Sequence, residues 1–224
     1  MTDPEILDIT IPVSETLAVW PGDTPYSFRL GWDMAAGASV NVGAVSMSVH
    51  TGTHVDAPFH FDSNAGGVHE IDLAALLGPV AVVDARGHAR IEASVFAGVD
   101  FGQTPRVLVR TNAWTDHTQF PESVPTLADD VPTFLAENGV RLFGIDVTSV
   151  DDIDSVTLPI HHALAAGGIT ILESADLRRV EPGVYTLVAL PLRLVGADAS
   201  PVRAILLPFS HPPAPSLIGM REGE

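Results

Sequence analysis

Residues 50–60 read His50-Thr-Gly-Thr-His54-Val-Asp56-Ala-Pro-Phe-His60, a short run that contains three histidines and one aspartate. Neutral imidazole and carboxylate groups are good ligands for zinc, manganese and similar ions. A flat strand would separate His50 from His54 by roughly 13 Å, too far to share one ion, and the glycine, threonines and proline disfavour a long helix. We therefore predict a folded loop or single turn over residues 51–58, in which Gly52 lets the backbone double back. Unrelated surface histidines are the alternative, but such dense clustering favours a metal site.

A second cluster lies further along the chain, where His161 and His162 are followed by Glu173. The pattern predicts a helix over residues 159–166, a stop at two glycines, and a buried strand over residues 169–172. A helix–turn–strand unit of this length returns its end close to its beginning, so a histidine and Glu173 can converge on one ion. Two histidines at a helix start are often merely solvated. A carboxylate at the end of a buried strand, however, is costly unless it is paired or binds a metal.

The composition excludes several classes of function. The 224 residues include 28 Asp and Glu but only 11 basic residues, for a formal net charge of −17. Such a chain repels phosphate backbones and anionic membrane surfaces, so we expect neither nucleic-acid nor membrane binding. The absence of Cys and Lys removes thiol nucleophiles, thiolate metal sites and Schiff-base chemistry. Acidic residues interrupt the N-terminal region and no apolar run is long enough to span a bilayer, so we expect a soluble cytoplasmic protein.

The remaining pattern predicts one α/β domain. The 18 prolines and 19 glycines indicate many short elements joined by tight turns. We expect extended or strand segments over residues 7–13, 39–50, 80–84, 106–110, 142–147, 184–190 and 204–207. We expect helices or helical turns over residues 69–77, 92–97 and 131–137. Residues 19–25 are rich in turn formers and predict a loop that presents Trp20, and the proline-rich residues 208–224 predict a C-terminal surface arm.

The run from His50 to Phe61 resembles the signature of the cyclase family of metal-dependent hydrolases. Three further stretches, residues 19–25, 161–173 and 198–204, are similar to the branch of that family that hydrolyses N-formyl-L-kynurenine. The resemblance extends from about Leu7 to Leu207, nearly the whole chain. The first motif is specific for the family, and the stretch around Trp20 with its distance to His50 points to the branch.

The resemblance implies a role for each of these residues. Five of them would bind two Zn²⁺ ions per chain, with Mn²⁺ or another divalent ion as a substitute: His50, His54, Asp56, His161 and Glu173. Asp56 and Glu173 would bridge the ions, and the twelve-residue step to Glu173 matches His161 rather than His162. His60 would donate and accept protons, and Trp20 would contact the aromatic substrate. The implied fold is a compact α/β domain with a β-barrel-like mixed sheet and short helices, assembled as a homodimer or larger homo-oligomer.

The implied activity is hydrolysis of N-formyl-L-kynurenine, a small aromatic formamide, to L-kynurenine and formate, a step of tryptophan degradation through kynurenine. Another enzyme of the family, opening a cyclic amide or lactone as isatin hydrolases do, would use the same metal site with a different pocket. A serine hydrolase would need a Gly-x-Ser-x-Gly elbow, which the sequence lacks. A non-catalytic metal-binding module would not need His60 beside the ligands.

Overall fold

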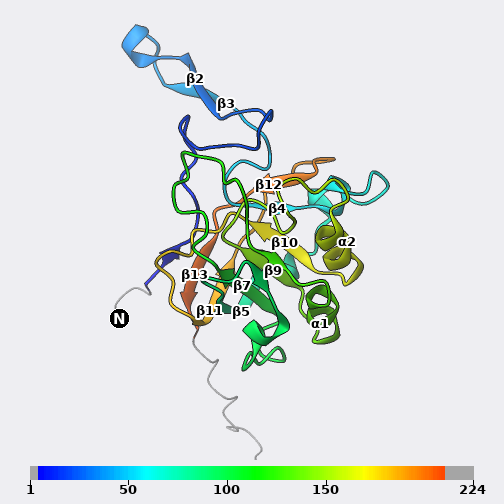
Figure 1. Ribbon diagram of the computed structural model, residues 1–224. Coiled ribbons are helices and arrows are strands. Elements are labelled where there is room, and N and C mark those ends of the chain that lie inside the picture. Colours follow the sequence, from blue (N-terminus) through cyan, green and yellow to red (C-terminus); the bar gives the residue numbers. More distant parts are fainter. Residues whose placement is uncertain (1–4, 210–224) are drawn as a thin grey trace, which may run out of the picture.

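Short buried runs of branched aliphatic residues form the centre of the sheet, because such side chains favour extended backbone and pack on both faces. The computed structural model describes residues 5–209 (Figure 1). Four strands lie parallel to one another at the centre: β5 (Leu77–Asp84), β7 (Arg106–Arg110), β9 (Leu142–Ile145) and β10 (Thr170–Glu173). Antiparallel strands flank them on both sides, which gives a mixed sheet of order β1-β13-β11-β5-β7-β9-β10-β4-β12.

The other elements are short, as the many glycines and prolines predict. The flanking strands are β1 (Leu7–Asp8), β4 (His54–Asp56), β11 (Gly183–Val188), β12 (Ala199–Pro201) and β13 (Ile205–Pro208). Two separate ribbons are β2 (Ser27–Trp32) with β3 (Val42–Ser46), and β6 (Arg90–Ile91) with β8 (Thr126–Leu127). The α-helices are α1 (Val131–Glu137) and α2 (Pro159–Ala166). Single 3₁₀ turns are η1 (Met34–Ala36), η2 (Pro58–His60), η3 (Val68–Glu70), η4 (Leu73–Ala75) and η5 (Ala93–Phe96). Within residues 5–209, no helix combines the length and apolar character needed to cross a membrane.

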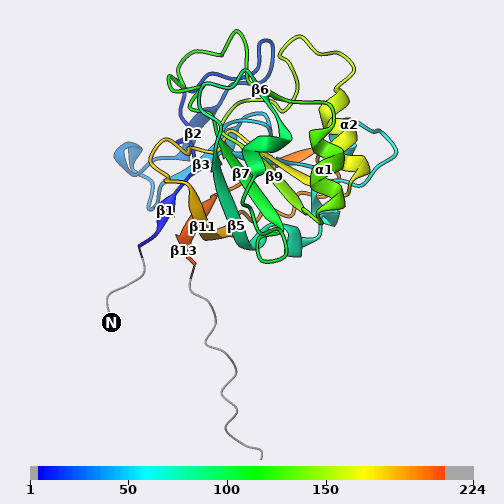
Figure 2. The same cartoon turned by 60° about the horizontal axis from the view of Figure 1, so that its bottom comes forward.

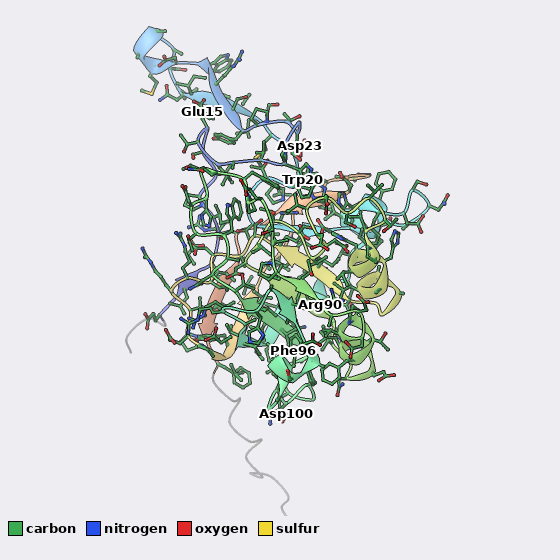
Figure 3. The ribbon with its side chains drawn as sticks, in the orientation of Figure 1. Glu15, Trp20, Asp23, Arg90, Phe96 and Asp100 are labelled. Carbon is green, nitrogen blue, oxygen red and sulfur yellow. The ribbon has the colours of Figure 1, made fainter. Side chains whose placement is uncertain are left out.

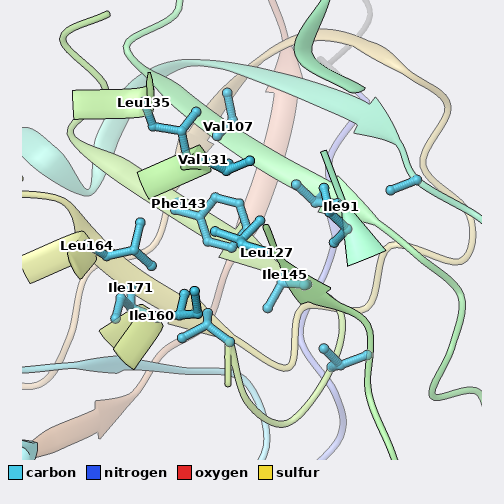
Figure 4. Packing of buried hydrophobic residues seen from close by; sticks show 14 of the residues in the cluster. Ile91, Val107, Leu127, Val131, Leu135, Phe143, Ile145, Ile160, Leu164 and Ile171 are labelled. Carbon is cyan, nitrogen blue, oxygen red and sulfur yellow. The ribbon is translucent and has the colours of Figure 1, made fainter. Parts of the chain in front are cut away.

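Side chains alternate between the two faces of the sheet and form two buried clusters. On one face, Phe143 packs with Leu135 of α1 and Leu164 of α2 (Figure 4), and both helices lie along this side of the sheet in Figures 1 and 2. On the other face, Leu108 belongs to a second cluster. A bridge between Thr10 and Ala175 joins the chain after β1 to the chain after β10, so the sheet curls on itself.

The predicted α/β fold with a curled mixed sheet is confirmed, and α1 and α2 have the predicted bounds. The helix predicted over residues 69–77 is wrong. The side chain of Asp72 accepts the N–H of Ala74 and starts a new turn, so η3 and η4 replace the helix, and Leu77 already opens β5. The strand predicted over residues 39–50 is shorter, and the loop predicted over residues 51–58 contains the short strand β4. Most of the predicted C-terminal arm, residues 210–224, lies outside the described residues.

Candidate metal centre and active site

The register between β4 and β10 builds the first part of the site. His54 lies opposite Glu173, and Asp56 lies opposite Ile171. Because residues two apart in a strand share a face, the side chains of His54, Asp56 and Glu173 project from the same face, the one that carries α2. The site therefore lies at the carboxyl end of β10, where open α/β sheets commonly bind their ligands.

The turn before β4 brings His50 to this face. Gly52 has φ of 70°, so the backbone reverses there as predicted. Thr53 fixes the turn, since its hydroxyl donates to the carbonyl of Ser174 and accepts the N–H of Ile11. The ring of His50 lies 4.9 Å from that of His54 between centroids, and its Nδ1 lies 3.2 Å from Asp56 Oδ1.

Helix α2 supplies His161, which Asp151 holds in place. The Asp151 carboxylate accepts the backbone N–H groups of Ile160 (2.9 Å) and His161 (3.0 Å), as a cap of the helix start. It also accepts Nδ1–H of His161 at 2.6 Å, which turns Nε2 toward Asp56 (3.7 Å) and Glu173 (3.5 Å). The neighbouring His162 is exposed and faces Phe61, with ring centroids 5.5 Å apart. The structure thus brings His161, and not His162, to the carboxylates.

Two sets of ligand atoms overlap at Asp56. The atoms of His50, His54 and Asp56 lie within 4.8 Å of one another, and so do those of Asp56, His161 and Glu173. Both carboxylate oxygens of Asp56 and Nε2 of His54 are buried without a hydrogen-bond partner among the described residues. Burying an unpartnered carboxylate is costly unless it binds a cation. These orphaned atoms, together with mixed nitrogen and oxygen donors, fit divalent metal ions.

In the cation-free protein, the carboxylates of the cluster stabilise the protonated forms of His50 and His161. Burial alone would lower the pKa of His161, but the carboxylates around it, Asp151 first, raise the pKa to about 12. Burial would likewise lower the pKa of His50, but Asp56 and Asp198 together raise it to about 9. Protons on these imidazoles take the place that metal ions would occupy, since ligands bind metals in deprotonated form.

His60 lies beside the cluster, at the end of η2. Its ring centroid is 4.1 Å from that of His50, and its Nδ1 is 3.6 Å from Asp198 Oδ2. Asp198 precedes β12 and contacts His50 Nε2 at 2.9 Å, so one carboxylate faces both imidazoles. Burial lowers the pKa of His60 below its usual 6.5, which keeps the imidazole neutral at pH 7. The atoms of His50, His60 and Asp198 also have ligand spacing, so a metal-binding role for His60 is the alternative to a proton-transfer role.

A cavity of about 310 Å³ joins these groups to Trp20. His50, His54, His60, His161 and Glu173 all line it. Trp20 forms part of its wall and packs edge-on against Phe120, with ring centroids 5.1 Å apart, and Figure 3 places Trp20 where the β2–β3 hairpin joins the body. A larger cavity of about 460 Å³ is lined by only one of the predicted site residues, Asp56. The smaller cavity is therefore the candidate active site.

Two site residues, Asp151 and Asp198, were not singled out from the sequence. Asp151 stands eight residues before α2 and caps it through a loop, so the capping pattern next to a helix start does not reveal it. Asp198 is the first residue of the stretch 198–204, which resembles the family, and this resemblance is the signal in the sequence that pointed to Asp198.

The fold and the site together define a metal-dependent hydrolase of the cyclase type. The family model Cyclase matches residues 7–152, and the chain belongs to this family. A kynurenine formamidase of Geobacillus thermodenitrificans is 47% identical over 200 residues, which are 89% of this chain and 96% of that protein. A solved structure described as a "predicted metal-dependent hydrolase" from Bacillus stearothermophilus is 30% identical, with a TM-score of 0.73 over 92% of this chain and 99% of the other. Isatin hydrolase A from Labrenzia aggregata shares the fold at 24% identity, with a TM-score of 0.76 over 91% of this chain and 93% of its own.

Proposed function

We propose that the chain is an arylformamidase that hydrolyses N-formyl-L-kynurenine to L-kynurenine and formate. The observation that carries the proposal is one cavity that combines a cluster of side chains with metal-ligand spacing, His60 and an aromatic wall. The name of the 47% identical relative supports the same substrate. The shared fold of isatin hydrolase makes the opening of a cyclic amide the competing reaction in any test.

Five residues would hold two ions in this proposal: His50, His54, Asp56, His161 and Glu173. When bound, divalent ions such as Zn²⁺ lower the pKa of water toward neutrality and polarise a carbonyl oxygen. Asp56 belongs to both sets of ligand atoms, so its carboxylate would bridge the ions and offset their mutual repulsion. The N–H of Val150 donates to Oε1 of Glu173 at 2.9 Å and so orients this carboxylate.

His60 would move the protons of the reaction. An amide nitrogen leaves only after it gains a proton, and the attacking water must lose one, so a single imidazole can accept the first and deliver the second. A neutral His60 at pH 7 can begin by accepting a proton. Asp198 Oδ2 lies 3.6 Å from Nδ1 of His60, so in this proposal Asp198 would act as a positioning residue and Nε2 of His60 would be the proton-transfer atom.

Trp20 would bind the aromatic ring of the substrate by stacking or edge contacts. We expect Trp20→Ala to raise KM for N-formyl-L-kynurenine more than it lowers kcat, because the indole lies at the cavity wall and not among the ligand atoms. Steady-state kinetics would measure both constants. An unchanged KM with a collapsed kcat would place Trp20 in the reaction instead of in substrate binding.

The deciding experiment measures turnover of N-formyl-L-kynurenine and of isatin by the same purified protein, before chelation, after chelation and after zinc is added back. We expect formamide hydrolysis that disappears with the chelator and returns with zinc. Efficient opening of isatin without formamide hydrolysis would keep the family and overturn the substrate. We also propose that the enzyme is a homodimer, that it is cytoplasmic, and that it acts in tryptophan degradation.

A further inference from the structure

One part of the proposed substrate has no partner assigned so far. N-formyl-L-kynurenine has a formamide, an aromatic ring and, at the end of a ketone side chain, an amino-acid group with one ammonium and one carboxylate. The formamide would lie at the metal cluster and the ring against Trp20. The amino-acid group then lies further out, toward the rim of the cavity, and the charges of the rim decide which aryl formamides the enzyme accepts.

Asp23 lines the cavity together with Trp20. Among the described residues of the cavity wall, the carboxylates are those of Asp23 and Glu173, and Glu173 belongs to the metal cluster. The backbone N–H of Asp23 donates to the carbonyl of Trp20 at 2.9 Å, so a tight turn fixes Asp23 relative to the indole. Figure 3 shows both residues near the base of the β2–β3 hairpin. Asp23 therefore stands beside the proposed ring-binding residue.

The carboxylate of Asp23 is available to a cation. Its Oδ1 accepts the N–H of Thr24 at 2.6 Å, which orients the side chain. Within residues 5–209, no arginine or histidine forms an ion pair with Asp23, and the residue is exposed at the rim of the cavity. A carboxylate that accepts a hydrogen bond from an ammonium group forms one of the stronger polar contacts in proteins.

The carboxylate of the substrate finds no such counterpart. The chain contains no lysine, and no arginine lines the cavity in the described part of the chain. Arg178 donates to the carbonyl of Thr115 in a neighbouring loop, but its guanidinium is already paired with Asp176. The four histidines of the cavity wall belong to the metal cluster or lie beside it. The net charge of −17 further opposes an anion.

Resting on the proposed function, we propose that Asp23 binds the ammonium group of the substrate and that the cavity has no subsite for the carboxylate. The substrate class is then aryl formamides with a cationic side chain, of which the amino acid is one member. Because Asp23 is exposed, water weakens the pair. Its effect lies between that of a surface ion pair and that of a buried charged hydrogen bond, about 5–10-fold in KM.

Four formamides that share the ring and the ketone provide the test on the zinc-loaded protein. N-formyl-L-kynurenine has both charges, N-formylkynuramine has only the ammonium, 4-(2-formamidophenyl)-4-oxobutanoate has only the carboxylate, and 2-formamidoacetophenone has neither. We expect the two ammonium compounds to have the lowest KM and similar kcat/KM values. The compound with only the carboxylate should bind no better than the uncharged one.

Asp23→Asn keeps the shape and the acceptor for the N–H of Thr24 but removes the charge. We expect it to raise KM for the two ammonium compounds by about 5–10-fold and to leave kcat and the KM of the uncharged compound nearly unchanged. Asp100→Asn is the matched control, since Asp100 is also exposed and its Oδ1 accepts the N–H of Gly102 at 3.1 Å, outside the cavity. Added salt should reduce the preference of the wild type for the ammonium compounds.

Three results would overturn the proposal. An equal rise of KM for all four compounds in Asp23→Asn would make Asp23 a structural residue of the turn at Trp20. A wild type that binds the carboxylate compound better than the uncharged one would reveal a carboxylate subsite. Turnover of none of the four compounds would overturn the proposed function, and the role of Asp23 with it. Normal turnover without any preference for the ammonium would leave the proposed function standing and remove only this role.

Discussion

Each imidazole among the proposed ligands has one ring nitrogen fixed by the protein and the other directed at a carboxylate. The carbonyl of Gly52 lies 2.8 Å from Nδ1 of His54, and the carboxylate of Asp151 lies 2.6 Å from Nδ1 of His161. When these rings are neutral, the contacts favour the tautomer with its proton on Nδ1, which leaves Nε2 able to bind a metal. The geometry of the site is therefore set before any ion arrives, and single side-chain changes should separate metal binding from proton transfer.

Replacing Glu173 tests the bridging role. Glu173→Gln keeps the shape but removes the charge that would face both ions, so we expect metal affinity to fall by more than the ~10–100-fold typical of changes outside the ligand set. Elemental analysis and titration with zinc would measure this loss together with the drop in turnover. Glu137→Gln, at the exposed end of α1, is the matched control. Full metal content and normal turnover in Glu173→Gln would return Glu173 to a structural role.

Replacing His60 separates a proton carrier from a ligand. We expect His60→Ala to keep its metal content and lose turnover of the formamide by roughly 10²–10⁴-fold. An activated ester should lose much less, because its leaving group needs no proton. Asp198→Asn, which keeps the shape beside His60, should slow the formamide reaction less than His60→Ala does. Loss of a metal ion from His60→Ala would make His60 a ligand.

At the scale of elements, local patterns predicted what depends on local sequence. The bounds of α1 and α2 follow from proline near each helix start and from small or turn-forming residues at each helix end. The three-residue strand β4 was missed because it exists only through its partners β10 and β12, which lie more than a hundred residues away in the chain. Apolar and polar or small residues alternate along β2, a pattern typical of a half-buried strand, although β2 and β3 are almost entirely exposed. No local signal shows that the hairpin leaves the body.

Glycine at the centre of β9 illustrates how tightly neighbouring strands are packed. A Cβ at Gly144 would lie 2.3 Å from Cδ2 of Leu108 on the adjacent strand β7. We expect Gly144→Ala to lower the free energy of unfolding by about 1–3 kcal/mol, the usual cost of overpacking a core. Urea denaturation would measure it. Gly183→Ala is the control in β11, since its Cβ would meet Tyr185 only at an ordinary 3.7 Å, and equal effects in the two variants would contradict this account.

At the scale of the whole molecule, the sequence predicted the fold class, and it singled out most of the residues that the structure gathers in the candidate site. The cluster at residues 50–60 contains three proposed ligands and His60 within eleven residues, so a single segment would carry much of the proposed chemistry. The order of the strands could not be predicted, because it depends on which buried faces pack together after the chain folds. The partners Asp151 and Asp198 depend on the same long-range packing. The site thus joins a local motif to distant residues through one curled sheet.

Removing the metal ions should make the stability of the whole molecule depend on pH. In the cation-free protein, burial alone would lower the pKa of His50 and of His161. The neighbouring carboxylates outweigh burial and raise the pKa of His50 to about 9 and that of His161 to about 12, above the 6.5 of an unfolded chain. A raised pKa means that the protonated form stabilises the fold, fully below pH 6.5 and less as the pH rises toward the folded-state pKa. We therefore expect the Tm of the chelated protein to fall between pH 6.5 and about 9.

The metal-loaded protein should behave differently, because its ligands are already deprotonated and the ions supply the positive charge. We expect its Tm to stay nearly level over the same range and to fall at lower pH, where protons compete with the ions for the imidazoles. Scanning calorimetry of both forms would make the comparison. His50→Gln in the chelated protein should flatten part of the alkaline slope, whereas His88→Gln, an exposed histidine outside the cavity, should leave it unchanged. Parallel curves for the two forms would show that these histidines do not hold the carboxylates together in the absence of metal.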